Sequence, residues 1–292
     1  MNLTKDRILS ILFDLLILLI MLLVIVVCLY PLVYVLSMSI SDPLAAARRE
    51  VWLLPKGFSV SSYQIIFENQ QVWRSYYNTI YYTVFGTIIN VVMTIILAYP
   101  LSRRNFFLRN PISIMVTFTM FFGGGLVPSF ILINQLGLYN TRWAILIPSA
   151  ISAYNMIIAK TFFQSIPESL IESAKLDGAS DLRILFSIVF PLSMPIISVL
   201  VLYYAVGHWN SYFPALLYLN DADLQPLQLY LRRILIENTG ELSGDMAISV
   251  DKSLAAMQLK YSIIIVSTLP ILCIYPFLQK YFVKGVMIGA IK

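Results

Sequence analysis

The chain of 292 residues is 59% hydrophobic and 12% charged, with a formal net charge of +5 and a mean hydropathy of +0.80. Soluble domains carry about 25% charged residues and under about 50% apolar ones, so this composition excludes a soluble globular protein. The positive balance is typical of a membrane protein with basic cytoplasmic ends and requires no nucleic-acid partner.

Six apolar stretches are long enough to cross a bilayer, because a transmembrane helix needs about 20 apolar residues to span roughly 30 Å of hydrocarbon. The six transmembrane helices are predicted over residues 11–37, 77–101, 112–134, 143–163, 192–217 and 261–281. The first stretch could instead be a signal peptide, but it is longer than the roughly 7–15 residues of such a core. We therefore predict an all-α membrane protein that lies in the bilayer.

Lysine and arginine gather at three places in the chain, and this sets the predicted orientation because cytoplasmic loops carry an excess of these residues. The residues are Lys5, Arg7, Arg103, Arg104, Arg109, Lys280, Lys284 and Lys292. With six spans all three places fall on one side, so both termini are predicted to be cytoplasmic. Residues 219–260 then form an external loop, and residues 166–187 lie on the cytoplasmic side between the fourth and fifth spans.

No residues are predicted to perform catalysis or to hold a metal. The sequence contains no Gly-x-x-x-x-Gly-Lys-Ser/Thr phosphate loop, and no glycine is followed by lysine. Gly123-Gly124-Gly125 is interpreted as a backbone kink near a membrane face. Cys28 and Cys273 lie in apolar runs and are interpreted as small hydrophobic residues. The chain is predicted not to be an enzyme and to bind no cofactor itself.

The stretch from Ser165 to Pro191 carries six charged side chains between apolar neighbours. Ser165 and Glu168 have capping-box spacing, which predicts a helix that begins at Ser165. Gly178 can take the left-handed conformation that ends a helix, and Ser180 can cap a second helix. An amphipathic connector on the headgroups is one interpretation, but the excess of acidic residues disfavours an anionic membrane surface. The pattern therefore favours a protein partner.

The same stretch resembles the EAA loop of ABC importer permeases. The resemblance is carried by Glu172-Ser173-Ala174, by Asp177-Gly178-Ala179, by Ile188 and by Phe190-Pro191. The middle alanine of the family pattern is Ser173 here, and its leucine is Phe190. The segments FFGGGLVP (121–128), LGLYN (136–140), YYAVGHWNSY (203–212) and the C-terminal YPFLQKYFVKGVMIGAIK are similar to the carbohydrate-uptake branch of the family.

The resemblance implies that residues 1–292 form a single permease domain of the type I ABC importer fold, in the bacterial cytoplasmic membrane. In that family the loop is a coupling helix that docks on the ATP-hydrolysing subunit. The implied docking residues are Glu172, Ser173, Ala174, Asp177, Gly178 and Ala179. The implied partners are a second homologous permease, a dimer of ATP-binding subunits that holds ATP and Mg, and an extracytoplasmic solute-binding protein. The implied solute is an oligosaccharide or a polysaccharide fragment.

A path for sugars needs uncharged hydrogen-bonding groups and aromatic faces at membrane depth. The candidates are Asn90, Asn155, Tyr203, Tyr204, His208, Trp209, Asn210 and Tyr212. Tyrosine and tryptophan also gather at membrane interfaces regardless of function, and a buried asparagine often bonds a neighbouring helix. The sequence leaves both interpretations open.

An ion-coupled secondary transporter is the alternative function. Such proteins place acidic or histidine side chains inside the bilayer as relays. The predicted spans contain only Asp14, at the start of the first, and His208, in the fifth. This scarcity disfavours ion coupling. A membrane-embedded hydrolase or glycosyltransferase is disfavoured as well, because the spans hold no carboxylate pair or metal cluster.

Overall fold

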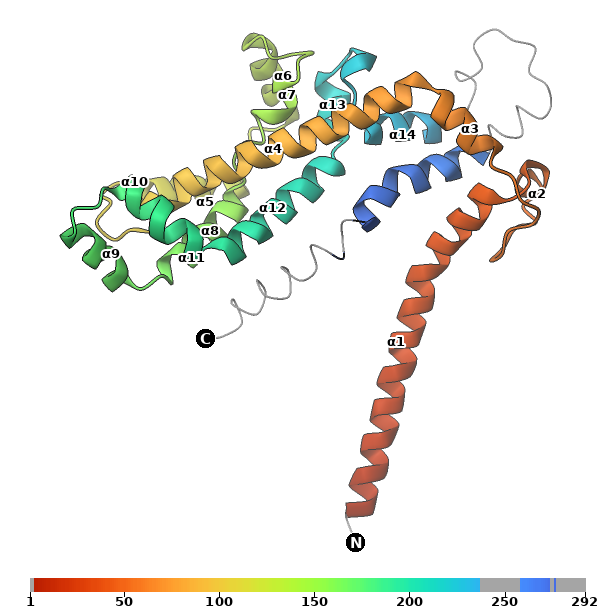
Figure 1. The fold of residues 1–292 in the computed structure, drawn as a ribbon, viewed down its shortest axis with the longest axis horizontal. Helices are drawn as coiled ribbons and strands as arrows, with labels where there is room; N and C mark the ends of the chain where they lie inside the picture. The colour runs from red at the N-terminus through yellow and green to blue at the C-terminus, as the bar shows by residue number, and fades with distance from the viewer. Residues whose placement is uncertain (1–2, 237–257, 274–275, 277–292) are drawn as a thin grey trace. The chain divides into compact units, whose positions relative to one another are not determined.

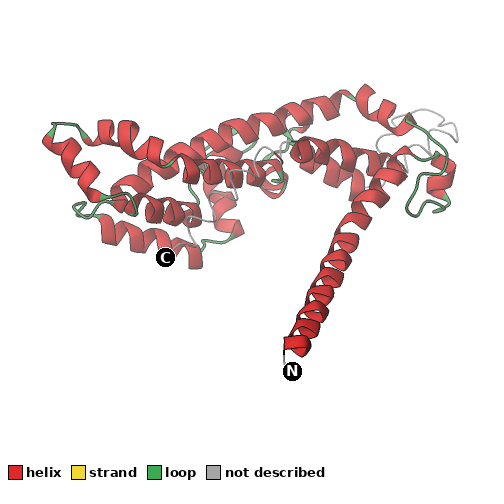
Figure 2. Ribbon diagram, turned by 60° about the horizontal axis from the view of Figure 1, so that its bottom comes forward, coloured by secondary structure: helices red, strands yellow, loops and turns green. Residues whose placement is uncertain are grey.

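A computed structural model describes residues 3–236, 258–273 and 276. Over these residues the regular elements are helices, and no strand is present (Figures 1 and 2). The described residues divide into two compact units. Unit 1 contains residues 3–69, 233–236 and 258–269, and unit 2 contains residues 70–232, 270–273 and 276. The prediction of an all-α protein is confirmed for this part of the chain.

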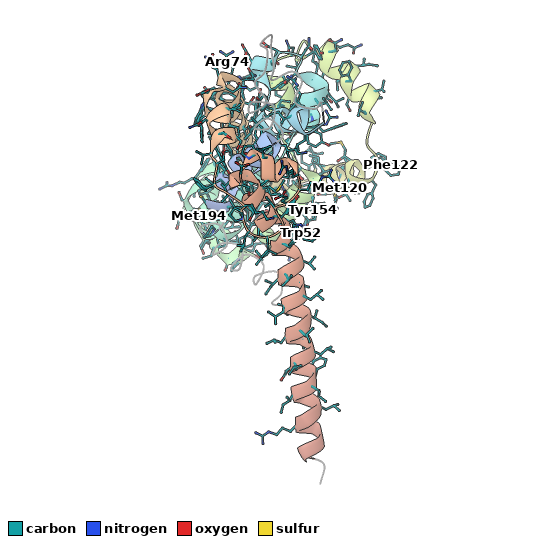
Figure 3. All side chains as sticks on the ribbon, turned by 90° about the vertical axis from the view of Figure 1, so that its right-hand side faces the viewer. Trp52, Arg74, Met120, Phe122, Tyr154 and Met194 are labelled. Carbon is teal, nitrogen blue, oxygen red and sulfur yellow. The ribbon has the colours of Figure 1, made fainter. Side chains whose placement is uncertain are left out.

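The helices of unit 1 are α1 (Leu3–Ile40), α2 (Pro43–Ala47), α3 (Ser61–Glu68) and most of a C-terminal helix (Gln258–Cys273). The helix α1 is apolar on every side, and its side chains project from it all round (Figure 3). Its most apolar 18-residue window has a mean hydropathy of 3.4 and is 0% buried within the structure. A helix that is apolar all round is typical of a membrane span.

Buried polar side chains join the C-terminal helix of unit 1 to the end of α1 and to α3. The Oγ atoms of Ser62 and Ser262 lie 2.7 Å apart. The Nε2 atom of Gln258 donates to the backbone oxygens of Met38 and Ser41, each at 2.7 Å. A polar group buried in apolar surroundings is stable only when it is hydrogen-bonded, so these contacts define how the segments pack.

Unit 2 contains the remaining helices, and α14 ends in residues that belong to unit 1. They are α4 (Gln70–Ser102), α5 (Arg109–Phe121), α6 (Leu126–Gln135), α7 (Trp143–Leu146), α8 (Ala153–Gln164), α9 (Glu168–Leu176), α10 (Asp181–Ile184), the π-helix η1 (Leu185–Val189), α11 (Phe190–Leu192), α12 (Met194–Trp209), α13 (Phe213–Tyr218), the 3₁₀ helix η2 (Ala222–Leu224) and α14 (Leu227–Ile236).

The helix α4 is central to unit 2, where it packs against α12 and α8 (Figure 1). Its buried face is rich in small and polar residues. These include Ser75, Asn78, Thr79, Gly86, Thr87, Asn90, Thr94 and Ala98. Small side chains allow helix backbones to approach closely within a membrane, and hydroxyl and amide groups bond across the interface. This face therefore brings α4, α8 and α12 together.

Helical segments of unit 2 meet at two sharp bends. The helices α5 and α6 meet at an angle of 117°. Gly123, Gly124 and Gly125 lie at this break, and Gly125 has a φ of 83°, so the predicted glycine kink is confirmed. The helical segment Asp181–Leu192 meets α12 at 81°. Pro191 lies just before this bend and Pro195 just after it, where each removes a backbone donor.

The predicted count of six spans is not confirmed by the described residues. Their lengths and composition allow two spans, α1 and α4, or up to four if each bent pair is one span. The apolar helix Gln258–Cys273 is shorter, and the predicted span 143–163 is divided into α7 and α8 with Pro148 between them. Residues 237–257 of the predicted external loop lie outside the described part of the chain. So do 274–275 and 277–281 of the predicted sixth span, together with Lys280, Lys284 and Lys292, and the orientation stays a prediction.

Candidate functional site

The helix α9 begins at Glu168, so the predicted capping box at Ser165 is wrong. Ser165 instead ends α8, and its Oγ donates to the backbone oxygen of Phe162 at 2.7 Å. Its backbone is helical, with φ of −79° and ψ of −11°, whereas an N-cap residue needs extended backbone. Pro167 has that extended ψ of 128° and precedes the first turn of α9.

The turn between α9 and α10 has the predicted form. Gly178 has a φ of 75°, a conformation that glycine adopts without steric cost. Its N–H donates to Lys175 at 3.0 Å, and the N–H of Ala179 donates to Ala174 at 2.9 Å, which together close the end of α9. Ser180 then caps α10 by accepting from the N–H of Arg183 at 3.4 Å. We call Glu168–Ile184 the α9–α10 hairpin.

The six predicted docking residues divide into an exposed set and a half-buried pair. Glu172, Ser173, Asp177 and Gly178 are exposed. Ala174 and Ala179 are half-buried and pack against the apolar core of unit 2. The hairpin also presents Leu176, which is 90% exposed, and Leu182, which is 69% exposed. These two leucines were not predicted, although an apolar residue beside the glycine turn was a visible signal. The exposed face therefore combines acidic and apolar groups.

Among the predicted path residues, Asn90 on α4 and His208 on α12 are brought into contact. The Oδ1 atom of Asn90 lies 2.5 Å from Nε2 of His208. The Nδ2 atom of Asn90 donates to the backbone oxygen of Ser149, in the segment between α7 and α8. Gly86 lies one turn before Asn90, and a Cβ atom added there would come within 3.0 Å of the His208 ring. Gly86 therefore makes room for the histidine.

Tyr204 occupies a second junction on the same helices. Its hydroxyl lies 2.7 Å from Oγ1 of Thr94 on α4 and accepts from the N–H of Ser152 at 3.3 Å. The side chain is buried. Together with Asn90 and His208, this residue forms a seam of uncharged hydrogen-bonding groups between α4, α12 and the segment before α8. We call these residues the α4–α12 seam.

The other predicted path residues lie apart from the seam contacts. Asn155 is buried in the first turn of α8. Trp209 is buried and its ring meets that of Tyr76 edge to face, with the centroids 6.3 Å apart. The exposed residues are Tyr203, Asn210 and Tyr212. The structure thus brings two of the eight candidates, Asn90 and His208, into direct contact, and it places Tyr204 at a separate junction of the same helices. The rest are distributed along α8, α12 and the turn after it.

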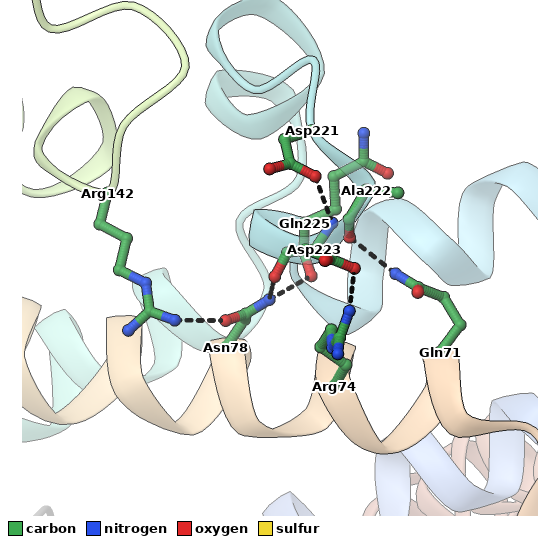
Figure 4. A network of polar contacts seen from close by, with 8 residues as sticks. All are labelled: Gln71, Arg74, Asn78, Arg142, Asp221, Ala222, Asp223 and Gln225. Atoms are coloured by element: carbon green, nitrogen blue, oxygen red, sulfur yellow. Dashed lines mark hydrogen bonds and ion pairs between the residues drawn. The ribbon is translucent and has the colours of Figure 1, made fainter.

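A second polar network, which was not predicted, joins α4 to the segment around η2 (Figure 4). Asn78 is fully buried, and its Nδ2 donates to the backbone oxygens of Asp223 at 2.7 Å and Gln225 at 3.2 Å. Its Oδ1 accepts from Arg142 at 3.2 Å. The signal for Asn78 was the same as that for Asn90, an amide at the depth of a predicted span.

Charged groups surround this network at its exposed edge. Arg74 forms an ion pair with Asp223 (Figure 4). The guanidinium of Arg142 lies over the ring of Tyr81, 4.4 Å from its centroid. Gln71 donates to the backbone oxygen of Ala222 at 2.7 Å. The first turns of α4 therefore hold the beginning of the predicted external loop in place.

The described residues contain no group of three or more His, Cys, Asp or Glu side chains that could hold a metal ion. The seam residues Asn90, Tyr204 and His208 offer hydrogen bonds but no carboxylate. This arrangement can bind polar uncharged groups and can support helix packing.

A helical membrane protein with a polar seam between long helices and an exposed helical hairpin has the features of a transport permease. The family model described as "Binding-protein-dependent transport system inner membrane component" matches residues 90–288. The chain belongs to this family, and it is the membrane permease subunit of a binding-protein-dependent ABC importer. The alternative of an ion-coupled secondary transporter is set aside by this membership.

Similar proteins match this chain over nearly its full length, and they include a permease and a transporter. The chain is 42% identical to the polygalacturonan/rhamnogalacturonan transport system permease protein YtcP of Bacillus subtilis, over 96% of this chain and 98% of the relative. It is 38% identical to the protein LplC of the same organism, over 91% and 90%. A crystal structure of a bacterial ABC transporter involved in the import of the acidic polysaccharide alginate matches with a TM-score of 0.84 and 33% identity. That match covers 95% of this chain and 98% of the solved chain.

Proposed function

We propose that this subunit forms half of the path through which a polysaccharide fragment or an oligosaccharide enters a bacterial cell. Two similar proteins support this proposal. One is a permease named for polygalacturonan and rhamnogalacturonan transport, and the other belongs to a solved transporter involved in alginate import. A second homologous permease completes the path, and an extracytoplasmic binding protein delivers the solute. The subunit spans the cytoplasmic membrane several times, with both termini in the cytoplasm.

The observation that carries the coupling role is the exposed α9–α10 hairpin. It holds a bend at Gly178 and presents Leu176, 90% exposed, beside the acidic residues Glu172 and Asp177. Together with Leu182, which is 69% exposed, Leu176 gives the hairpin two apolar groups among polar residues, and apolar surface rimmed by polar residues is where other proteins dock. We assign this surface to the ATP-binding subunit, which holds ATP and Mg, because the chain has no phosphate loop of its own.

The α4–α12 seam supports a role in solute passage. Asn90, Tyr204 and His208 place amide, phenol and imidazole groups between the two helices. Such groups exchange hydrogen bonds with sugar hydroxyls without the desolvation cost of a buried charge. We include Asn155, Tyr203, Trp209, Asn210 and Tyr212 as further candidates along the same path.

The solute class is tested with the complete transporter in proteoliposomes and its binding protein. Binding protein loaded in turn with galacturonan fragments, alginate fragments and neutral oligosaccharides is added, and ATP hydrolysis is measured. At least one carbohydrate is expected to raise hydrolysis several-fold above unloaded binding protein. Equal hydrolysis with every carbohydrate and with none, in a preparation that does import another class of solute, would overturn the carbohydrate assignment.

A further inference from the structure

A cavity of about 360 Å³ lies in unit 2 where α4 ends and where α5 and α9 begin. Its lining includes Arg103, Arg104, Arg109 and Glu168. The other lining residues are uncharged, so the cavity has an excess of positive charge. It is separate from the seam between α4 and α12, and it adjoins the first turn of the α9–α10 hairpin.

The three arginines are only partly compensated by protein groups. The Nε atom of Arg109 is buried and has no hydrogen-bond partner among the described residues. Arg104 lies 3.7 Å from Glu168, but both side chains are largely exposed, so this ion pair is weak. Arg103 donates to the neutral groups Ser102 Oγ, at 2.9 Å, and the backbone oxygen of Phe163. None of these contacts places an anionic group beside Arg109.

The burial of positive charge around the cavity also favours the binding of an anion. Burial lowers the pKa of the Arg103 guanidinium, while Tyr99 and Glu168 act in the opposite direction. An arginine keeps its charge at any physiological pH, so the cost of burial is relieved by an added anion and not by deprotonation. Lys160 lies on the neighbouring α8, where its Nζ donates to Ser113 Oγ at 2.7 Å and adds positive charge near Arg109.

The lining of the cavity suits a phosphate group. Guanidinium groups bind phosphate oxygens through paired N–H donors, which is the strongest common contact for such a group. The helices α5 and α9 both begin at this cavity, and free N–H groups at a helix start attract anions. Ligand pockets range over about 300–1,000 Å³. This volume therefore suits a headgroup or a small anion and not an oligosaccharide.

We propose that the cavity binds a phosphate-bearing anion, and that the anion is the phosphodiester headgroup of an anionic lipid such as cardiolipin. The cavity lies at the end of α4, which is long and apolar enough to cross the membrane, and it therefore lies at the depth of the headgroups. Basic pockets at the cytoplasmic ends of membrane helices are sites for such lipids. The bound headgroup links the membrane surface to the first turn of α9.

The test uses the transporter purified with the subunits that accompany it. It is reconstituted in phosphatidylcholine vesicles with and without cardiolipin, and lipid retained after extraction is measured by native mass spectrometry. In a second arm, the shift in unfolding temperature caused by inorganic phosphate is measured in detergent. The variants are Arg109→Gln, Arg104→Glu on the exposed rim of the cavity, and the control Arg48→Gln, which removes an exposed arginine at the end of α2, outside the cavity.

Wild type and Arg48→Gln are expected to retain cardiolipin, and Arg109→Gln is expected to bind it about tenfold more weakly, as for the loss of one charged hydrogen bond. Arg104 is exposed, so the fold should tolerate its replacement. If Arg109→Gln does not assemble, Arg104→Glu is expected to show weaker cardiolipin binding in its place. A phosphate shift that Arg109→Gln abolishes, without cardiolipin retention, would support the anion site and identify free phosphate as its source. Equal retention in all variants, or no response to either probe, would overturn the proposal.

Discussion

Asn90 on α4 and His208 on α12 lie with Oδ1 and Nε2 2.5 Å apart, although 118 residues separate them in the sequence. Because Oδ1 accepts only, Nε2 of the histidine donates. The amide nitrogen of Asn90 is used on Ser149, so the pair joins three segments of unit 2. The contact depends on Gly86, whose missing side chain leaves space for the imidazole.

The first prediction concerns this space. Replacing Gly86 with alanine places a methyl group within 3.0 Å of the His208 ring, so α4 and α12 must separate or the ring must turn. Overpacking of this kind costs about 1–3 kcal/mol. The unfolding temperature of the purified transporter is expected to fall.

Gly207→Ala is the matched control, because Gly207 is also helical and an added Cβ would meet nothing within 4 Å. Alanine there is expected to leave stability unchanged or to raise it by up to about 1 kcal/mol through helix propensity. Equal unfolding temperatures for the two variants would show that the Gly86–His208 approach does not limit the packing.

The second prediction concerns the bend of the α9–α10 hairpin. Gly178 has a φ of 75°, and a residue with a Cβ pays about 1–2 kcal/mol for that conformation. Gly178→Ala is expected to change the direction of α10 and to reduce the amount of ATP-binding subunit that copurifies. Gly137→Ala is the control, since Gly137 has a φ of 68° and open space around it but lies after α6. Loss of the subunit in both variants would point to general destabilisation.

The third prediction concerns the apolar part of the hairpin. Leu176→Asp removes a side chain that is 90% exposed in this chain, so the fold should tolerate the change. Burying a leucine at an interface contributes about 1.5–3 kcal/mol, and a buried unpaired carboxylate adds a penalty. Copurification of the ATP-binding subunit and transport should fall together. Leu136→Asp, at a leucine that is 62% exposed after α6, should retain the subunit. Full retention in Leu176→Asp would exclude Leu176 from the docking face.

The fourth prediction concerns the network of Figure 4. Asn78 is fully buried and holds Asp223, Gln225 and Arg142, so Asn78→Ala leaves their groups unpaired at a cost of about 1–3 kcal/mol. Stimulation of ATP hydrolysis by the binding protein is expected to fall, because the predicted external loop starts here. Arg74→Ala removes only an exposed ion pair, worth up to about 1 kcal/mol, and should have a small effect. The opposite order of effects would contradict the role of Asn78.

Local features of the hairpin could be predicted from the sequence because they depend on neighbouring residues. The positive φ of Gly178 and the cap at Ser180 follow from the chemistry of glycine and serine at a helix boundary. The predicted start at Ser165 was wrong because the same Ser-x-x-Glu spacing occurs where α8 ends. A serine hydroxyl that donates to a preceding carbonyl and one that caps a following helix look alike in sequence.

Long-range contacts could not be predicted in the same way. Hydropathy identified α1 and α4, and the three glycines predicted a kink within residues 112–134, but neither gives the angle of 117° at which α5 and α6 meet. The pairing of Asn90 with His208, and of Asn78 with Arg142, depends on how separate helices pack. A single sequence does not contain that information in its periodicity. The cavity at Arg109 likewise joins residues from the ends of four helices, α4, α5, α8 and α9.

Solute uptake into proteoliposomes that hold the complete transporter tests the central claim most directly. ATP is sealed inside, the loaded binding protein is supplied outside, and accumulated solute is measured with and without proton or sodium gradients. Uptake is expected to require both ATP and the binding protein, to be lost in Leu176→Asp, and to be unaffected when the ion gradients are dissipated. Uptake that continues without ATP and collapses with an ion gradient would contradict the account.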